Sequence, residues 1–331
     1  MAPDNGRHQY HVACEVGGTV TKMGLFSNAG SLVSSARWDT PDTPEEIVNL
    51  IVREARGVSA AHDIRVKALM GVGVSLPAAV DPSTLAIGRC DNIGNLEGFP
   101  LASVLGEELG CRIYLENDAN SALRGEIRAG AAAGSRNAAL VVVGTGVGAA
   151  LCVDGRILSG SSGSVGEIGY MPFSHPATTL LAEGTHQLHS LLAGPALENL
   201  ARSRRNSYPK TTAGADTNLR ELFDLAANDP LGSAVLVHAS GILASVVSML
   251  ASVADPDVIV LTGGVGSNPV LVNRCMSLCA RGDRPPRRIA AGELGSLAGL
   301  YGLSDIVRSN YESARSTPSS IMEEEANDTT H

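Results

Sequence analysis

The stretch Cys111–Glu126, C-R-I-Y-L-E-N-D-A-N-S-A-L-R-G-E, joins a predicted strand to a predicted helix. The apolar run ends at a polar cluster of Asn117, Asp118 and Asn120, and an alanine-rich helical pattern follows. In an α/β sheet, groups at the carboxyl end of a strand open into the ligand crevice, so Asp118 is a candidate catalytic residue. Asp118 or Asn117 could instead simply cap the helix, because both residue types are favoured there.

The composition is that of an ordinary globular protein long enough for two domains, with 331 residues, 44% hydrophobic and 18% charged. A net charge of −9 and only 3% aromatic residues argue against a nucleic-acid partner. The six cysteines form no CxxC pair, so neither a zinc knuckle nor a dithiol redox site is indicated. The start of the chain lacks the order of a signal peptide, and no apolar run approaches membrane-spanning length. We therefore expect a cytoplasmic protein with no membrane partner.

Upstream of the quoted stretch, residues 10–37 alternate apolar runs with turn signals, which predicts two hairpins. Thr43 is placed to cap a helix that runs to about Arg56. The apolar run Val66–Val74 predicts a buried strand, and Leu101–Leu109 a helix.

Near Ala138 the same order of strands seen at the start of the chain begins again. This doubled pattern predicts two similar domains facing one cleft, formed by residues 8–122 and 123–293, with a helix at 294–308 completing the first. Residues 160–193 are predicted to be irregular, and 309–331 to be a disordered acidic tail. Helices are further predicted at 194–205, 218–227, 232–254 and 269–280, and strands at 258–261 and near residue 289.

Three glycine-rich turns, Glu15–Thr19, Gly144–Gly148 and Gly263–Ser267, follow predicted strands. Glycines allow backbone amides to close around an anion. The second turn fits a dinucleotide fingerprint superficially, but a strand follows it where that fingerprint requires a helix. The third precedes a helix, where an adenosine and its α-phosphate could rest. Each turn alone could be only a tight turn. Together with an acid at a crevice they favour phosphoryl transfer, which needs a carboxylate to accept the hydroxyl proton.

Seven segments together resemble the ROK family of sugar kinases and sugar-responsive repressors, in the family's order from about residue 10 to 305. They are E-V-G-G-T, P-A-A-V-D-P, N-I-G-N-L-E-G-F-P-L, E-N-D-A-N, V-G-T-G-V-G, S-V-G-E-I-G-Y-M and L-T-G-G-V-G. The resemblance implies an α/β fold of two ribonuclease-H-like domains, of the actin-like ATPase and hexokinase type, around a central cleft that holds sugar and ATP.

The resemblance also implies a set of site residues. Asp118 would be the base on the sugar hydroxyl, Asn117 and Glu167 would hold other hydroxyls, Asn92 would line the pocket, and Ala78 stands in the turn that lines the sugar. The positions that would face ATP and its phosphates are Glu15, Gly17, Gly18, Thr19, Lys22, Gly144, Thr145 and Gly146, with Gly263 and Gly264 at the adenosine.

The chain departs from the family pattern at several positions. Glu15 stands where the family usually has Asp, which affects the geometry of Mg²⁺, and Tyr170 stands where a histidine usually follows G-E-I-G. The cysteine-rich zinc loop is absent, so we predict no structural zinc. In the matching region His189 aligns with a second sugar-binding Glu. His175, His186 and His189 could in principle bind a metal, although the last two also suit an exposed helix face.

These observations predict an ATP- and Mg²⁺-dependent, glucokinase-like kinase of a hexose or hexose derivative, which could be a homodimer. The family's Pro-Gly-Pro turn at the sugar appears here as Pro77-Ala78-Ala79. The alternative is a catalytically impaired sugar-binding sensor, which the four departures at Glu15, Ala78, Tyr170 and His189 would explain. A DNA-binding repressor is disfavoured, because the first predicted strand starts near Tyr10 and leaves no room for a helix-turn-helix before it.

Overall fold

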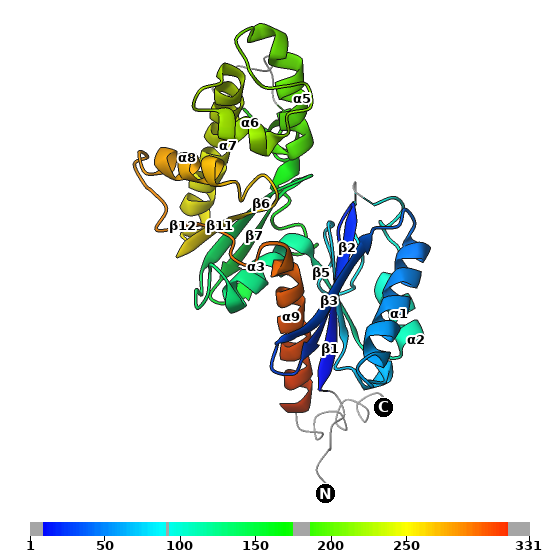
Figure 1. The fold of residues 1–331 in the computed structure, drawn as a ribbon. Helices are drawn as coiled ribbons and strands as arrows, with labels where there is room; N and C mark the ends of the chain where they lie inside the picture. The colour runs from blue at the N-terminus through cyan, green and yellow to red at the C-terminus, as the bar shows by residue number, and fades with distance from the viewer. Residues whose placement is uncertain (1–8, 91–92, 175–185, 317–331) are drawn as a thin grey trace, which may run out of the picture. The chain divides into compact units, whose positions relative to one another are not determined.

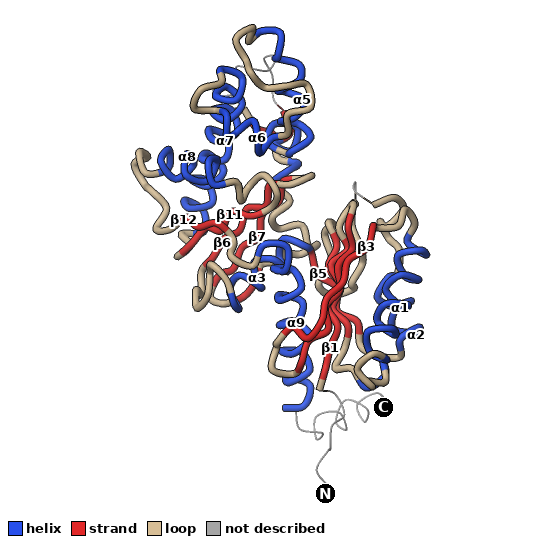
Figure 2. The backbone as a smooth tube through the Cα atoms, viewed as in Figure 1, coloured by secondary structure: helices blue, strands red, loops and turns tan. Residues whose placement is uncertain are grey.

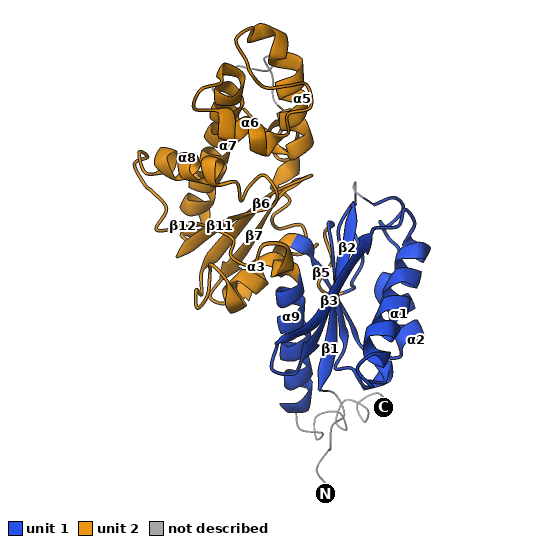
Figure 3. Cartoon of the chain, in the orientation of Figure 1, with its two compact units in different colours: residues 1–78, 84–118, 300–331 blue, residues 79–83, 119–299 orange. Residues whose placement is uncertain are grey.

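The computed structural model describes residues 9–90, 93–174 and 186–316. The chain forms two compact units, shown in separate colours in Figure 3. Unit 1 comprises residues 1–78, 84–118 and 300–331, and unit 2 comprises residues 79–83 and 119–299. Each unit contains one five-stranded mixed sheet.

The sheet of unit 1 begins with an antiparallel meander of β1 (Tyr10–Val16), β2 (Val20–Ser27) and β3 (Leu32–Asp39), so the two predicted hairpins are confirmed. Two further strands, β4 (Val72–Leu76) and β5 (Ile113–Asn117), continue the sheet parallel to β1. The strand order is β3-β2-β1-β4-β5.

Helices cover both faces of this sheet, as Figures 1 and 2 show. On one face lie α1 (Pro44–Ala60) and α2 (Leu101–Leu109), and on the other lies α9 (Ala298–Ser316). The predicted cap of α1 is confirmed, because Thr43 Oγ1 accepts from the Glu46 amide at 3.3 Å. Gly73 of β4 lets α9 approach the sheet closely: a Cβ there would lie only 3.1 Å from Leu303 Cβ.

The sheet of unit 2 repeats the same connectivity, with a meander followed by two parallel strands. Its order is β12-β11-β6-β7-β8. The strands are β6 (Ala138–Val143), β7 (Val147–Val153), β8 (Arg156–Ile157), β11 (Val258–Thr262) and β12 (Ile289–Ala291). The repeated strand order predicted from the sequence is therefore present, and the α/β fold class is confirmed.

Alternate residues of β6 and β11 point into two different cores, as the period of two requires. Val141 and Leu261 belong to a large core on the side of α4 to α8, whereas Leu140 and Val260 belong to a smaller core on the side of α3. These helices are α3 (Asp118–Ala129), α4 (Leu188–Leu192), α5 (Gly194–Arg204), α6 (Leu219–Leu225), α7 (Pro230–Ala254) and α8 (Pro269–Cys279).

The expectation that no apolar run approaches membrane-spanning length is wrong for α7. This helix has 25 residues and a mean hydropathy of 2.0 over its most apolar window, enough to cross a membrane by length and composition alone. However, 61% of that window is buried inside the structure, and residues such as Val235 and Ile242 belong to the large core of unit 2. That burial is what a central core helix requires, and it explains the composition.

Three other predictions need correction. The predicted strand Val66–Val74 is instead a 3₁₀ turn at Val66–Ala68 followed by β4 from Val72. The run is apolar because Leu69 and Met70 are buried between the two elements. Residues 309–316, assigned to a disordered tail, continue α9, and residues 317–331 lie outside the described part of the chain.

The segment 160–193 is also less irregular than predicted. It contains a 3₁₀ turn at Ile168–Tyr170, a two-stranded pair of β9 (Pro172–Phe173) with β10 (His186–Gln187), and α4. The short lengths of these elements left no periodic signal in the sequence. Further 3₁₀ turns lie at Arg205–Ser207 and Gly295–Leu297.

Candidate active site

Three parallel strands of unit 1 end at the same edge of the sheet. Glu15 of β1 pairs with Ser75 of β4, and Leu76 of β4 pairs with Asn117 of β5. The segments that follow these strands therefore leave the sheet side by side. This carboxyl edge is where ligands bind in open α/β sheets.

The junction after β5 has the form predicted from the sequence. Asn117 is the last residue of β5 and Asp118 the first residue of α3. Asp118 is half-buried and lies inside the first helical turn, so the capping position falls to Asn117 and not to Asp118. The Asn117 side chain is only 8% exposed, and its Nδ2 donates to the Ala78 carbonyl oxygen at 3.2 Å. This bond joins the ends of β4 and β5 next to Asp118.

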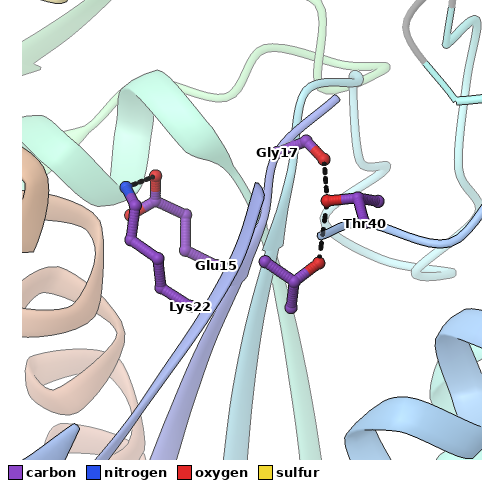
Figure 4. Close-up of polar contacts among 5 residues, drawn as sticks. Glu15, Gly17, Lys22 and Thr40 are labelled. Atoms are coloured by element: carbon purple, nitrogen blue, oxygen red, sulfur yellow. Dashed lines mark hydrogen bonds and ion pairs between the residues drawn. The ribbon is translucent and has the colours of Figure 1, made fainter. Parts of the chain in front are cut away.

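The glycine turn after β1 is held by a threonine from the end of β3. Thr40 Oγ1 donates to the Gly17 carbonyl oxygen at 2.7 Å, as Figure 4 shows, and the Thr40 amide donates to the Thr19 carbonyl oxygen at 2.9 Å. Gly17 has no room for a side chain, because a Cβ there would lie 2.9 Å from the Val20 carbonyl oxygen. Gly18 and Thr19 form the exposed tip of the turn, where their backbone can meet an anion.

Two of the predicted phosphate-side residues form an ion pair. Lys22 Nζ lies 2.9 Å from Glu15 Oε1, across the β1–β2 pair in which these residues stand opposite each other (Figure 4). Their side chains are 23% and 21% exposed, so each also reaches solvent. The pair places one fixed positive and one fixed negative charge next to the Gly17 turn.

The first glycine turn of unit 2 is shorter than predicted, because Val147 and Gly148 already belong to β7. The remaining turn, Gly144–Gly146, is closed by a bond from the Gly144 amide to the Gly146 carbonyl oxygen at 2.9 Å. The Gly194 amide at the start of α5 donates to the Gly144 carbonyl oxygen at 2.8 Å. The amino end of an 11-residue helix therefore lies against this turn, an arrangement that favours anions.

The Gly263 turn lies against the end of β6. The amides of Val265 and Gly266 donate to the Val143 carbonyl oxygen at 3.0 and 2.9 Å. Gly263 has φ +90, and a Cβ there would collide with that same carbonyl. Gly264 has open space around it and is exposed. The two glycine turns of unit 2 thus meet at the carboxyl ends of neighbouring strands.

One predicted sugar-side residue, His189, lies close to the Gly144–Gly146 turn within unit 2. His189 is on α4, and a Cβ added to Gly146 would lie 3.6 Å from His189 Cε1. A Cβ added to Gly169 would lie 3.7 Å from His189 Cβ, so the 3₁₀ turn that follows Glu167 also reaches this histidine. Glu167 is half-buried at the start of that turn, and Tyr170 is 37% exposed at its end.

Some predicted residues are not placed by the structure. Asn92 and His175 lie outside the described residues. Within residues 9–90, 93–174 and 186–316, no group of three or more His, Cys, Asp or Glu side chains could hold a metal ion. His186 lies on β10, and His189, three residues later in the sequence, lies on α4.

Two residues that position the site were missed by the sequence analysis. The first is Thr40; its role could have been read from the β2–β3 register, which pairs Val20 with Asp39 and so brings residue 40 to the Gly17 turn. The second is Glu126, which is fully buried and accepts amide bonds from Ala131 at 2.7 Å and Leu294 at 3.0 Å. It ties the end of α3 to the segment that leads into α9, and no local pattern signals this.

Comparisons with known proteins agree with this arrangement. The sequence model of the ROK family matches residues 11–310. A glucokinase of Halalkalibacterium halodurans is 29% identical over 277 residues, which cover 78% of this chain and 81% of that protein. The crystal structure of a ROK family glucokinase from Streptomyces griseus, in complex with glucose and AMPPNP, has a TM-score of 0.76 and 26% identity over 91% of this chain and 99% of that one.

A ROK hexokinase from Thermus thermophilus has a TM-score of 0.73 and 28% identity, and the match covers 92% of this chain and 99% of that one. These proteins share the actin-like ATPase fold with two sheet-containing domains, as the resemblance implied. The family model covers nearly all of the described chain, and the glycine turns and the Asn117–Asp118 junction lie within the matched range. The chain therefore belongs to the ROK family.

Proposed function

We propose that the protein is a sugar kinase that transfers a phosphoryl group from ATP to a hydroxyl of a glucose-like hexose or hexose derivative. The observation that carries this proposal is Asp118, a half-buried carboxylate at the carboxyl end of β5 beside the fixed Asn117 amide. The relatives named glucokinase support the enzyme class, and the particular sugar is part of the proposal. We expect the enzyme to act in the cytoplasm.

In this proposal Asp118 accepts the proton of the attacking hydroxyl. Asn117 and the Ala78 turn hold neighbouring hydroxyls, because their mutual hydrogen bond fixes both at the sheet edge. Asn92, Glu167 and His189 complete the sugar-binding set. Phosphoryl transfer depends mainly on positioning and charge stabilisation, so fixed side chains on strand and helix ends suit the reaction.

The glycine turns would hold the nucleotide. Gly17, Gly18 and Thr19 in unit 1 and Gly144, Thr145 and Gly146 in unit 2 would face the phosphates, with Gly263 and Gly264 at the adenosine. Two of these turns require glycine for their own packing, because a Cβ at Gly263 or Gly17 would occupy space that a neighbouring carbonyl group of the protein already fills. The start of α5 beside Gly144 adds a favourable dipole for the phosphates.

Mg²⁺ fits the charge pattern at the Gly17 turn. Mg²⁺ is bound through one or two carboxylates together with substrate phosphates, and Glu15 is a partly exposed carboxylate next to that turn. When bound, Mg²⁺ supplies charge neutralisation for the phosphates. Lys22, held 2.9 Å from Glu15, would keep the Glu15 side chain oriented and add positive charge.

The test measures ADP release by the purified protein with ATP and Mg²⁺ over a panel of aldohexoses, hexosamines and N-acetylhexosamines. We expect one sugar to give turnover and Asp118→Asn to lower it by about a hundredfold or more, as loss of a general base does. Asp224→Asn, an exposed carboxylate on α6, is the matched control and should retain the rate.

A different result would favour the sensor alternative. If no sugar gives turnover but one sugar raises the melting temperature, the protein binds sugar without efficient catalysis. The substitutions at Glu15, Ala78, Tyr170 and His189 would then be the next to examine, and the kinase proposal would be rejected.

A further inference from the structure

A cavity lies within unit 1, at the opposite end of the strands from Asp118. It has a volume of about 250 Å³ and opens at the amino ends of β4 and β5, beside the last turns of α9. Tyr114 in this cavity precedes Asp118 by four residues, which is roughly 13 Å along a strand. We call this cavity the α9 pocket. Its lining residues are Lys67, Leu69, Met70, Cys111, Arg112, Tyr114, Tyr311, Ala314 and Arg315.

The charged residues of the α9 pocket are all basic. Lys67, Arg112 and Arg315 contribute three cations, and none of the nine lining residues is acidic. This contrasts with the whole chain, whose net charge is −9. Burial raises the pKa of the Cys111 thiol to about 11, so Cys111 adds no negative charge at neutral pH. Like charges gathered around one cavity repel each other unless an anion lies between them.

The uncharged part of the α9 pocket contains a polar group whose hydrogen bonding is unsatisfied. Leu69 and Met70 are buried and form an apolar floor. The Tyr114 hydroxyl is buried and has no hydrogen-bond partner among the described residues. A buried hydroxyl without a partner is costly and calls for an explanation, such as a missing acceptor. The Tyr114 ring packs over Gly71, where a Cβ would lie 2.9 Å from ring atom Cε2.

Two of the cations have defined positions. The Lys67 side chain lies along Gly110, the left-handed cap of α2, where a Cβ would lie 3.0 Å from Lys67 Cε. The Arg315 guanidinium lies 5.7 Å from the centre of the Tyr311 ring, one turn earlier on α9. Both exposed side chains therefore lie against neighbouring residues of unit 1.

We propose that the α9 pocket is a binding site for a small ligand that carries a carboxylate or phosphate group. Arg112 and Arg315 hold the anion through their planar guanidinium groups, Lys67 adds a point charge, and the Tyr114 hydroxyl donates to the ligand. The volume corresponds to roughly eight water molecules, which suits a dicarboxylate or a small phosphate ester. The three cations outweigh the partial negative charge at the end of α9.

A ligand in the α9 pocket would fasten the last turns of α9 to unit 1. It would contact Arg112 ahead of β5 and Arg315 on the helix at the same time. This role does not depend on the proposed kinase activity. The carboxylates could come from a free small anion or from Glu323–Glu325 of the same chain, which lie outside the described residues.

The test uses Cys111, which lines the pocket, as a local reporter. The full chain is treated with iodoacetamide at about pH 8.5 with succinate or inorganic phosphate up to about 50 mM, at constant ionic strength. Peptide mapping by mass spectrometry follows Cys111, with the partly buried Cys90 as internal reference. We expect the anion to slow modification of Cys111 by about threefold or more relative to Cys90.

Variants locate the effect. Lys67→Gln combined with Arg112→Gln should remove the protection, whereas Arg37→Gln, an exposed arginine on β3 of the same unit, should keep it. Each rate of Cys111 modification is compared with and without anion in the same variant, because loss of a nearby cation also changes the reactivity of the thiol. Protection that persists in the double variant would overturn the proposal.

The source of the carboxylate is tested by the triple variant Glu323→Gln, Glu324→Gln and Glu325→Gln in the full chain. If these side chains are the ligand, Cys111 reacts faster in the variant without added anion, and succinate then slows the reaction. If the ligand is a free anion, the variant behaves like the wild type. Cys111 reactivity that ignores anions in both proteins would show an ordinary solvated basic surface and reject the site.

Discussion

The first hairpin turns of the two sheets occupy the same place in the repeat but are held by different groups. In unit 1, the hydroxyl of Thr40 donates to the Gly17 carbonyl oxygen at 2.7 Å. In unit 2, the Gly144–Gly146 turn receives the Gly194 amide, a backbone group at the start of α5. One turn is thus supported by a side chain, and the other by backbone contacts that only glycine permits.

The length of the third strand explains this difference. β3 has eight residues and reaches the turn, since Val20 pairs with Asp39 and Thr40 follows directly. β8 has only two residues, and its last contact, Cys152 with Ile157, lies at the far end of β7 from the turn. No residue from β8 can therefore support the Gly144–Gly146 turn, and α5 with the Gly263 turn takes its place.

The largest expected effect concerns unit 2, whose turns depend on glycine. Gly263→Ala places a Cβ against the Val143 carbonyl oxygen and forces an L-residue to φ +90. We expect a loss of about 4 kcal/mol in the free energy of unfolding of unit 2. Hydrogen exchange of peptides from β6 and β11 measures it locally.

Gly264→Ala is the matched control for that change. Gly264 has no atom within 4 Å of an added Cβ, so this variant should lose less than about 0.5 kcal/mol. Equal effects of the two substitutions would contradict the view that unit 2 depends on glycine for close backbone approach.

The second largest expected effect is a difference between the two units in their stability in acid. In unit 1, His11 is fully buried and stacks on Phe26. Its Nε2 shares a hydrogen bond of 2.7 Å with Ser304 Oγ. Burial, with a smaller contribution from Arg308, lowers the pKa of His11 from 6.5 to about 4. The unfolded chain therefore binds the proton first, and unit 1 loses up to about 3 kcal/mol as the pH falls from about 6.5 to 4.

Unit 2 should resist acid over the same range. Burial alone would raise the pKa of Asp229, but hydrogen bonds from the amides of Gly232 and Thr212 and the hydroxyls of Thr211 and Thr212 lower it from 3.8 to about 2. Its contribution is lost only as the pH falls from about 4 to 2. Hydrogen exchange at pH 7 and pH 5 should show unit 1 opening first. His11→Gln should flatten that dependence, and a variant with an unchanged pH profile would exclude His11 as the cause.

The smallest effect concerns the side-chain support of unit 1. Thr40→Val keeps the shape of residue 40 and removes the hydroxyl, which should cost about 1 kcal/mol and raise the KM for ATP. Thr40→Ser keeps the hydroxyl and should restore both values. If Thr40→Val behaves like the wild type in urea unfolding and in KM, the backbone of the Gly17 turn is sufficient by itself.

The parts of the fold that the sequence predicted correctly are those governed by local signals. The Thr43 cap, the hairpins before Asp39 and the strand-to-helix junction at Asp118 each follow from residue types within a few positions. The prediction of a strand at Val66–Val74 was wrong for the first residues of that range. The chain makes a turn there, but the buried residues Leu69 and Met70 give it the apolar pattern of a strand.

The parts that failed depend on contacts between distant residues. The last two turns of α9 are polar, yet they remain helical, with Tyr311 and Arg315 lining a cavity beside residues before β5. Thr40 and Glu126 support the site through partners that are 23 and 168 residues away. No local pattern reveals such pairs, whereas Asp118, Glu167 and the glycine turns carry recognisable motifs.

Unit 1 contains both the first strand and the last helix of the described chain, joined by His11 and Ser304 across 293 positions. During synthesis, β1 to β5 emerge long before α9. The face of the unit 1 sheet that α9 covers therefore stays uncovered until α9 is made. At roughly 5 to 20 residues per second, the roughly 200 residues from the end of β5 to the end of α9 take on the order of 10 to 40 s. Unit 2 can fold meanwhile, since its residues 119–299 are complete first. Until α9 is made, the uncovered face of the unit 1 sheet is therefore the part of the newborn chain most open to association with other chains.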